Sequence, residues 1–191
     1  MSTVTILGKG NIGSALAGIA GKAGREVQVL DTDSADTPVT GDVVVLAVPF
    51  AAVDSVVAQR GEQLAGKVVV DVTNPVDFAT FDGLVVPADS SAAAHLQAAL
   101  PESKVVKAFN TTFAATLASG SVGDSTTTIL IAGDDAEAKS AVSALVTDGG
   151  LKALDAGSLK RARELEALGF LQITLAASEQ VGWDGGFAVV A

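Results

Sequence analysis

Short runs of β-branched and other apolar residues alternate along the chain with longer stretches of helical character. Strands are predicted for residues 3–7, 27–30, 43–48, 67–72, 104–108, 126–132 and 151–154. Helices are predicted for residues 12–23, 50–58, 91–99 and 135–145, with Ser90 and Asp134 capping the last two, and a longer final helix for about residues 158–181. This alternation is typical of an α/β fold with a doubly wound parallel sheet.

One connection between predicted strands is unusually short. From Asp31 to Asp42 there are only twelve residues, and Pro38 is among them. A crossover between parallel strands needs about a dozen residues or more and usually contains a helix. We therefore expect an irregular loop here, which would leave the adenine side of any nucleotide site more open than usual.

Charge and composition exclude several kinds of partner. The 191 residues carry a formal net charge of -10 and include no Tyr and one Trp, which argues against nucleic acid and against an anionic membrane surface. No apolar run reaches the roughly 18 to 20 residues of a transmembrane helix, and the N-terminus lacks a secretory pattern, so we expect a cytoplasmic protein. With no Cys and one His, a metal site is not expected.

A glycine-rich turn follows the first predicted strand and precedes the first helix. Residues 8–13 read GKGNIG, in which Gly8 permits a tight turn, Gly10 allows close approach of a phosphate, and Gly13 lets the helix pack on the strand. Asp31 follows eighteen residues after Gly13, at the end of the second strand, where a carboxylate can bind a ribose. The pattern predicts a Rossmann-type dinucleotide-binding domain over residues 1–157, with a helix and apolar tail over residues 158–191 as its C-terminal extension.

Further motifs follow the later predicted strands in a fixed order. They read LAVP at 46–49, VVDVTNP at 69–75, VVKAFNT at 105–111, AGDD at 132–135 and DAGSL at 155–159. This succession resembles the coenzyme F420-dependent NADP oxidoreductases and the related nucleotide domains of STEAP metalloreductases. The resemblance covers nearly the whole chain and implies hydride transfer between a nicotinamide and a deazaflavin or flavin-like ring.

The resemblance also implies which residues line the nicotinamide end of the cleft. They follow the third, fourth and fifth strands and are Ala47, Val48, Pro49, Asn74, Pro75, Ala108, Phe109 and Asn110. The two prolines also fit ordinary turn chemistry. Asn74 and Asn110 are the candidates for positioning the rings, and no acid or base catalyst is expected. The predicted pyrophosphate site is formed by Gly8, Lys9, Gly10, Asn11, Ile12 and Gly13, and the ribose site by Asp31 and Thr32.

The residues after the second strand depart from the family pattern. Relatives that use NADP carry basic side chains there, whereas this chain has Asp31, Thr32 and Asp33, and no Lys or Arg between Arg25 and Arg60. A carboxylate accepts hydrogen bonds from the ribose of NAD and repels the 2'-phosphate of NADP. The cofactor expected is therefore NAD(P)(H) with NAD(H) favoured, and F420, FMN or FAD is the expected second substrate.

A histidine, a charged run, a lysine and three phenylalanines could each have a chemical role or a structural one. His95 and the charged run of residues 160–166 are expected to be solvated helix residues, although the run could also clamp an anionic cofactor. Lys107 is expected to cap a sheet edge or hold a carboxylate. Phe109, Phe113 and Phe170 could form a ring platform, but core packing is the better default.

Two alternatives to a flavin or F420 reductase remain open. An imine or carbonyl reductase of a small substrate is one, although such enzymes normally need a His, Lys or Tyr proton donor. A non-catalytic module that senses NAD(P)(H) is the other. The apolar tail around Trp183, Phe187, Val189 and Val190 predicts a homodimer, with burial against the chain's own cleft as the competing explanation.

Overall fold

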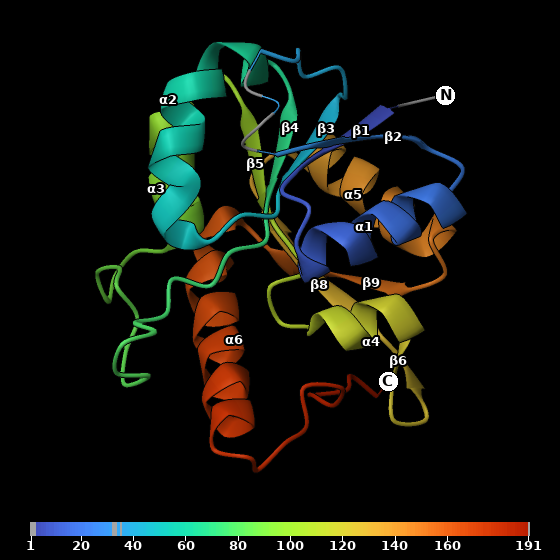
Figure 1. Ribbon diagram of the computed structural model, residues 1–191, viewed down its shortest axis with the longest axis vertical. Helices are drawn as coiled ribbons and strands as arrows, with labels where there is room; N and C mark the ends of the chain where they lie inside the picture. Colours follow the sequence, from blue (N-terminus) through green and yellow to red (C-terminus); the bar gives the residue numbers. More distant parts are fainter. Residues whose placement is uncertain (1–2, 32–33, 35, 191) are drawn as a thin grey trace.

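The computed structural model describes residues 3–31, 34 and 36–190. Seven strands form one sheet in the order β2-β1-β3-β4-β5-β8-β9 (Figure 1). Their bounds are Thr3–Leu7 (β1), Glu26–Leu30 (β2), Val43–Leu46 (β3), Val68–Asp71 (β4), Lys104–Lys107 (β5), Thr128–Gly133 (β8) and Lys152–Gly157 (β9). The predicted α/β class is confirmed, since each of these strands overlaps a predicted one.

Helices cover both faces of the sheet, and each face has its own apolar core. They are Asn11–Lys22 (α1), Val53–Leu64 (α2), Ala92–Ala99 (α3), Ala114–Ser119 (α4), Ala136–Asp148 (α5) and Ala162–Ala177 (α6). Helices α1 and α5 lie on one face and α2 and α3 on the other, while α6 extends beyond the sheet (Figure 1). The side chains of strand β3 alternate between the two faces, so that Val43 and Val45 pack in one core and Val44 and Leu46 in the other.

The sheet is mostly parallel, as expected for a Rossmann-type fold, with one antiparallel pair that the sequence analysis did not predict. Strand β8 runs antiparallel to β5, with Val106 opposite Gly133, and β9 is parallel to β8. The chain between β5 and β8 forms the short helix α4 and a hairpin of β6 (Ser121–Val122) and β7 (Ser125–Thr126), none of which was predicted. Antiparallel neighbours need no crossover over the face of the sheet, so the chain can return along β5 after α4 and the hairpin.

Several helix boundaries differ from the predicted ones, and at two of them the capping residue sets the start of the helix. The side chains that cap α3 and α5 are Ser91, which accepts a hydrogen bond from the Ala94 amide, and Asp135, which accepts one from Ala138. Each lies one residue after the predicted cap. The final helix is shorter than expected, because a 3-10 turn (Leu159–Arg161, η3) precedes α6 and the helix ends at Ala177.

The predicted irregular loop joins β2 to β3 across β1. Its described residues form no α-helix, in agreement with the prediction, and Arg60 of α2 holds them by donating to the carbonyls of Ser34 and Thr37 at 2.5 and 2.8 Å. Since β2 and β3 lie on opposite sides of β1, the connections diverge at the end of β1 and leave a crevice there. In the part of the chain described, no helix is long and apolar enough to cross a membrane.

Candidate functional site

The glycine turn stands at this crevice, and its glycines differ in what surrounds them. Gly8 has a φ of 118°, and a Cβ there would overlap the Ala47 carbonyl oxygen. A Cβ on Gly13 would overlap the Gly8 carbonyl, so this glycine permits the close packing of α1 on β1. A Cβ on Gly10 would meet nothing within 4 Å. The backbone beside Gly10 is therefore accessible to a ligand, at the end of α1 where amide groups lack helical partners.

A cavity of about 310 Å³ opens between the glycine turn and the end of β2, and we call it the turn cavity. Asp31 lies in its wall, where its carboxylate forms an ion pair with Lys9 and accepts a hydrogen bond of 2.9 Å from the Ser34 hydroxyl. Arg60 also lines the turn cavity, but its guanidinium is committed to the loop carbonyls described above. Arg25, which could have approached this region, pairs with Asp148 at 2.8 Å. Thr32 and Asp33 lie outside the described residues.

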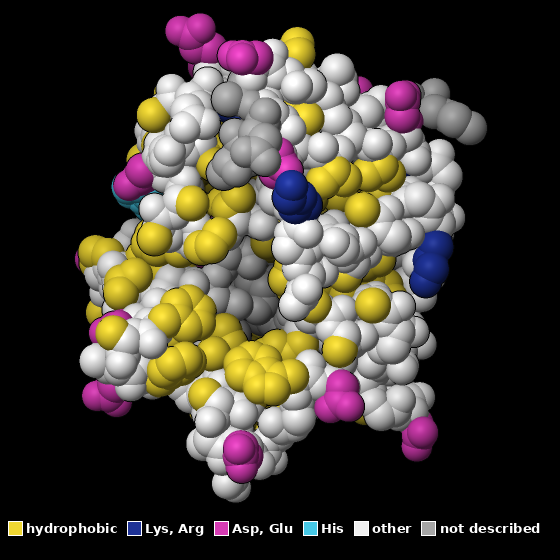
Figure 2. All heavy atoms as spheres, viewed as in Figure 1, with side chains coloured by type: hydrophobic (Ala, Val, Ile, Leu, Met, Phe, Trp, Pro, Cys, Tyr) yellow, Lys and Arg dark blue, Asp and Glu magenta, His cyan; other side chains and the backbone are white. Residues whose placement is uncertain are grey.

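Two further cavities continue from the turn cavity along the ends of the strands. The central cavity, of about 490 Å³, shares Ala47, Val48 and Pro49 with the turn cavity. The tail cavity, of about 420 Å³, shares Asn74 and Ile173 with the central cavity and is walled on its far side by Phe113 and Trp183. Figure 2 shows the hollow on this face, with hydrophobic side chains gathered along its rim. The three cavities therefore form one continuous cleft.

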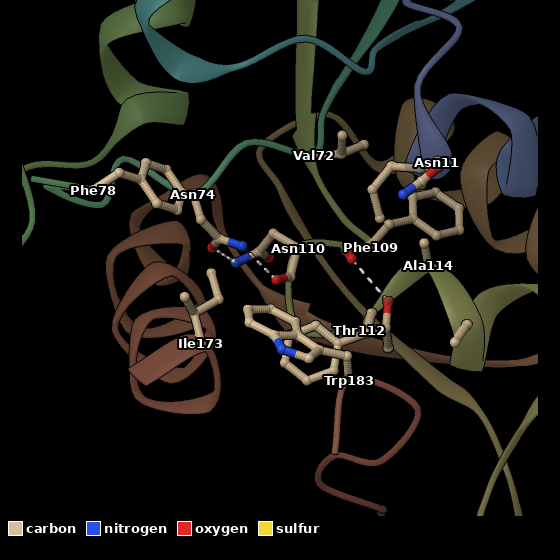
Figure 3. Close-up of a pocket in the computed structure, with 13 residues that line it drawn as sticks. Asn11, Val72, Asn74, Phe78, Phe109, Asn110, Thr112, Ala114, Ile173 and Trp183 are labelled. Carbon is tan, nitrogen blue, oxygen red and sulfur yellow. Dashed lines mark hydrogen bonds between the residues drawn. The ribbon is translucent and has the colours of Figure 1, made fainter. Parts of the chain in front are cut away.

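Two asparagine side chains meet where the central and tail cavities join. Asn74 follows β4 and Asn110 follows β5, and their amides point toward each other in Figure 3. Asn74 donates to the Asn110 carbonyl at 2.8 Å, and the Asn110 Nδ2 donates to the Asn74 Oδ1 and to the Leu165 carbonyl of α6, both at 2.9 Å. This pair of side chains therefore joins the ends of β4 and β5 to α6.

Some polar atoms at the cleft have no protein partner. The Thr73 hydroxyl and the Asn110 Oδ1 are buried and accept or donate no hydrogen bond among the described residues. Thr73 lines the central cavity and Asn110 the tail cavity. Buried polar groups are almost always paired in native proteins, so unpaired ones at a cleft suit the recognition of a polar ligand group.

The described walls of the central and tail cavities contain no ionisable side chain. They combine apolar and aromatic residues with the amides of Asn11, Asn74 and Asn110 and the hydroxyls of Thr73 and Thr112. A wall of this kind can position flat, uncharged rings by shape and by a few hydrogen bonds. It contains no group whose pKa suits general acid or base catalysis.

A charged cluster is buried behind the cleft. Lys107 donates to Asp71 at 2.9 Å and to the Thr73 carbonyl at 2.6 Å, and it forms an ion pair of 2.9 Å with Glu166. Glu166 also accepts a hydrogen bond from the Ala92 amide at the start of α3. Burial raises the pKa of Glu166 above its usual range, and the Lys107 ammonium opposes this rise. The cluster ties the β4 end that carries Asn74 to β5, α3 and α6.

This cluster corrects two expectations from the sequence. Lys107 holds carboxylates as one alternative proposed, but β5 is an interior strand, so Lys107 caps no sheet edge. Glu166, expected to be solvated as part of the charged run, is wholly buried. The parallel register that places Asp71 opposite Lys107 could have indicated the first pair from the strand sequences. Nothing local could have indicated Glu166.

The C-terminal tail folds back toward the cleft. The rings of Trp183 and Phe113 lie 5.0 Å apart, and the Phe187 amide donates to the Gln172 side chain of α6 at 3.2 Å. Trp183, Phe187 and Val190 nevertheless remain largely exposed. The tail thus contributes a wall to the tail cavity and also presents apolar surface to solvent.

The structure brings most of the predicted site residues to the cleft. Those that line it are Gly8, Lys9, Gly10, Asn11, Ile12, Asp31, Ala47, Val48, Pro49, Asn74, Phe109 and Asn110. Gly13 supports the turn from behind, while Pro75 and Ala108 are buried and line none of the three cavities. Ala108 faces the core because it continues the strand pattern of Val106.

Several lining residues were not predicted, and the aromatic candidates separate. The unpredicted ones include Thr73, Phe78, Thr112, Ile173 and Arg60, whereas Trp183 belongs to the tail for which burial against the cleft was the competing explanation. Phe109 is a core residue, the Phe113 ring lies against Trp183, and Phe170 of α6 packs against the apolar cluster that includes Phe113, so core packing describes these residues better than a platform of three rings. His95 is half-exposed as expected and pairs with Asp54 at 2.7 Å. Among the described residues, no cluster of His, Asp or Glu could hold a metal.

Comparison with known proteins decides the family. A family model described as "NADP oxidoreductase coenzyme F420-dependent" matches residues 29–75. The F420-dependent NADP reductase of Methanocaldococcus jannaschii is 36% identical over 156 residues, which cover 80% of this chain and 70% of that protein. The chain belongs to the F420-dependent NADP oxidoreductase family. The resemblance stated from the strand-end motifs is thereby confirmed.

Two further proteins are similar to this chain, one in sequence and one in structure. The rat metalloreductase STEAP3 is 41% identical over 107 residues, covering 56% of this chain but 21% of that protein. A crystal structure of a putative F420-dependent NADP reductase from Arthrobacter sp. FB24 matches over 100% of both chains, with a TM-score of 0.86 and 25% identity. The family names refer to NADP, so they do not support the preference for NAD(H) expected from Asp31.

Proposed function

We propose that the chain is an oxidoreductase that transfers hydride between a nicotinamide dinucleotide and the ring of F420 or a flavin. The observation that carries this proposal is the pair of adjoining cavities, central and tail, whose described walls contain no ionisable side chain. Hydride transfer between two bound rings depends on their relative position more than on a proton donor. An imine or carbonyl reductase needs such a donor, and the described walls offer none.

The residues present fit a dinucleotide laid along the cleft. Gly10 and Asn11 would hold the pyrophosphate at the start of α1, where the open surface around Gly10 leaves room for it. Asp31 would bind the adenosine ribose in the turn cavity. The Thr73 hydroxyl, which has no hydrogen-bond partner among the described residues, would bind the nicotinamide carboxamide in the central cavity. The bound dinucleotide supplies the hydride donor or acceptor.

The tail cavity would hold the second ring. Phe113 and Trp183 give it a flat apolar wall, and Asn74 and Asn110 place amide groups at its junction with the central cavity. Aromatic walls favour planar ligands, and the amides fix orientation without adding charge. The two rings would then meet at the asparagine pair.

We further propose that NAD(H) is preferred, although the relatives' names refer to NADP. Asp31 is held in the wall of the turn cavity by Lys9 and Ser34, with its side chain 18% exposed. A 2'-phosphate in this cavity would meet the carboxylate, and Arg60 is engaged with the loop carbonyls of Ser34 and Thr37. Two unit charges about 4 Å apart repel by roughly 4 kcal/mol at an effective dielectric constant of 20.

Dissociation constants for NADH and NADPH at two salt concentrations test this preference. We expect tighter binding of NADH, and a smaller difference at high salt because screening weakens the repulsion. Asp31→Ala should move the preference toward NADPH, whereas Asp54→Ala, which removes an exposed carboxylate away from the cleft, should leave it unchanged. Equal or tighter NADPH binding by the wild type would show that Asp31 does not select the nucleotide.

Steady oxidation of NADH and NADPH with F420, FMN, FAD and quinones tests the hydride transfer itself. We expect turnover with at least one ring acceptor and none with small cyclic imines or carbonyl compounds. Tight nucleotide binding without turnover on any acceptor would identify a sensing module instead. Turnover on imines alone would assign the tail cavity to a different substrate class.

A further inference from the structure

We infer that Gly169 is a positioning residue for hydride transfer, because its missing side chain lets α6 hold the amide pair of Asn74 and Asn110 in place. This inference rests on the proposed function. Gly169 lines none of the three cavities of the cleft, and it acts through the two asparagines. The argument depends on how closely helix and amides approach one another.

The space beside Gly169 is filled by the amide pair. A Cβ built on Gly169 would overlap the Asn74 Oδ1 and would lie 3.0 Å from the Asn74 Cγ and 2.9 Å from the Asn110 carbonyl oxygen. Figure 3 shows the two amides beside the helix that carries Ile173. Two of these atoms belong to the Asn74 amide itself and the third to backbone, so a methyl group must displace part of the pair.

The amide pair is attached to α6 close to Gly169. The Asn110 Nδ2 donates to the Leu165 carbonyl at 2.9 Å, and Leu165 lies one turn before Gly169. The Asn110 Nδ2 also donates to the Asn74 Oδ1, which is the atom closest to Gly169. A shift at Gly169 therefore acts on a hydrogen-bonded unit, and it cannot be absorbed by one flexible side chain.

Helix formation gives no reason for glycine at this position. Gly169 is the only glycine of α6, it is buried in the middle of the helix, and its φ is not positive. Alanine is the most favourable helix residue and glycine one of the least favourable, so alanine would be the better residue for α6 alone. The close approach of the asparagines is the local feature that alanine would disturb.

The first test compares Gly169→Ala with Gly18→Ala. Gly18 lies in α1, and a Cβ there meets nothing within 4 Å, so this control makes the same chemical change without crowding. We expect Gly169→Ala to slow single-turnover oxidation of the reduced nucleotide by about tenfold or more, since a displacement near 1 Å can cost up to a hundredfold. The dissociation constant for ADP-ribose should change less than about threefold, because no adenosine contact is altered. Gly18→Ala should match the wild type in both.

A second variant separates positioning from general damage to the fold. Asn74→Ala removes two of the three crowding atoms, so adding Gly169→Ala to it should slow hydride transfer by a smaller factor than Gly169→Ala does in the wild type. Fully additive losses would overturn the inference, because Gly169 would then act independently of the pair. A folded Gly169→Ala protein with the wild-type rate would also overturn it.

A spectroscopic measurement keeps this inference distinct from the proposed function. Side-chain amide resonances of Asn74 and Asn110 in nitrogen-15 spectra should move in Gly169→Ala and stay unchanged in Gly18→Ala. Unmoved resonances would refute the inference whatever the activity. A wild type that transfers hydride to no ring acceptor would refute the proposed function, even where the resonances move as expected.

Discussion

Replacing Gly10 by glutamate should weaken nucleotide binding by about 100-fold or more without unfolding the chain. The Gly10 backbone has a φ of -69° and a ψ of -173°, which any residue can adopt, and a Cβ there meets nothing within 4 Å. The new side chain enters the space in which the pyrophosphate would lie. A negative charge at the start of a helix is favourable by about 0.3 to 1 kcal/mol, so α1 should not be weakened.

The magnitude follows from the charge that the substitution brings to the helix start. A carboxylate about 4 Å from one phosphate charge is repelled by roughly 4 kcal/mol at an effective dielectric constant of 20. Because about 1.4 kcal/mol corresponds to a tenfold change in the dissociation constant, this repulsion weakens nucleotide binding by up to about 1000-fold. Salt screens part of the repulsion, and we expect the remaining loss of affinity to be at least about 100-fold. Calorimetric titration with NADH and NADPH measures this loss, and circular dichroism on heating checks the fold.

Two neighbouring substitutions serve as controls. Gly10→Ala adds a methyl group without charge, so it should weaken binding less, and its difference from Gly10→Glu should shrink at high salt. Gly8→Ala should instead lower the melting temperature, because its φ is 118° and the new Cβ would overlap the Ala47 carbonyl. A folded Gly10→Glu protein that binds nucleotide as the wild type does would remove the glycine turn from the site.

Three further predictions concern the amide pair, the buried cluster and the tail. Asn110→Ala should slow hydride transfer by about tenfold to a hundredfold while leaving the affinity for ADP-ribose nearly unchanged, since one unpaired buried group costs roughly 1 to 3 kcal/mol; wild-type turnover would refute this role. Glu166→Gln should gain stability relative to the wild type as the pH rises, because a raised pKa means that the folded state binds the Glu166 proton more tightly than the unfolded chain and loses stability when that proton leaves. Urea unfolding at several pH values measures the difference, and the opposite slope would contradict the cause assigned to the shift. Light scattering should give the mass of a dimer, and deletion of residues 182–191 should lower that mass or slow transfer to the acceptor; a monomer whose kinetics survive the deletion would exclude both roles of the tail.

Much of the cleft could be predicted because its first half depends on local geometry. The glycine turn lies between a strand and a helix that are adjacent in sequence, and the residues after parallel strands necessarily gather at one edge of the sheet. Asn74 and Asn110 were found by this rule, and the structure joins their amides. Pro75 and Ala108 were included by the same rule but are buried away from the cavities, because the rule does not say toward which face a side chain points.

The second half of the cleft depends on long-range contacts. Trp183 reaches Phe113 where the tail after α6 returns toward the cleft, and the apolar tail sequence left this return and a dimer contact as alternatives. Glu166 looked solvated within a charged helix start, yet it pairs with Lys107 from a strand that lies far earlier in the chain. The burial of a charge is determined by its partners, and these partners are distant in sequence.

The sequence by itself determined the alternation of strands and helices, the family, and the turn where a dinucleotide would bind, because periodicity, glycine spacing and strand-end motifs are encoded in neighbouring residues. Only the tertiary structure decided that β8 runs antiparallel to β5, that a lysine and two carboxylates are buried behind the strand ends, and that α6 and the tail contribute walls to the cleft. These features arise from packing between elements that the chain separates by tens of residues, and such packing overrides local preference.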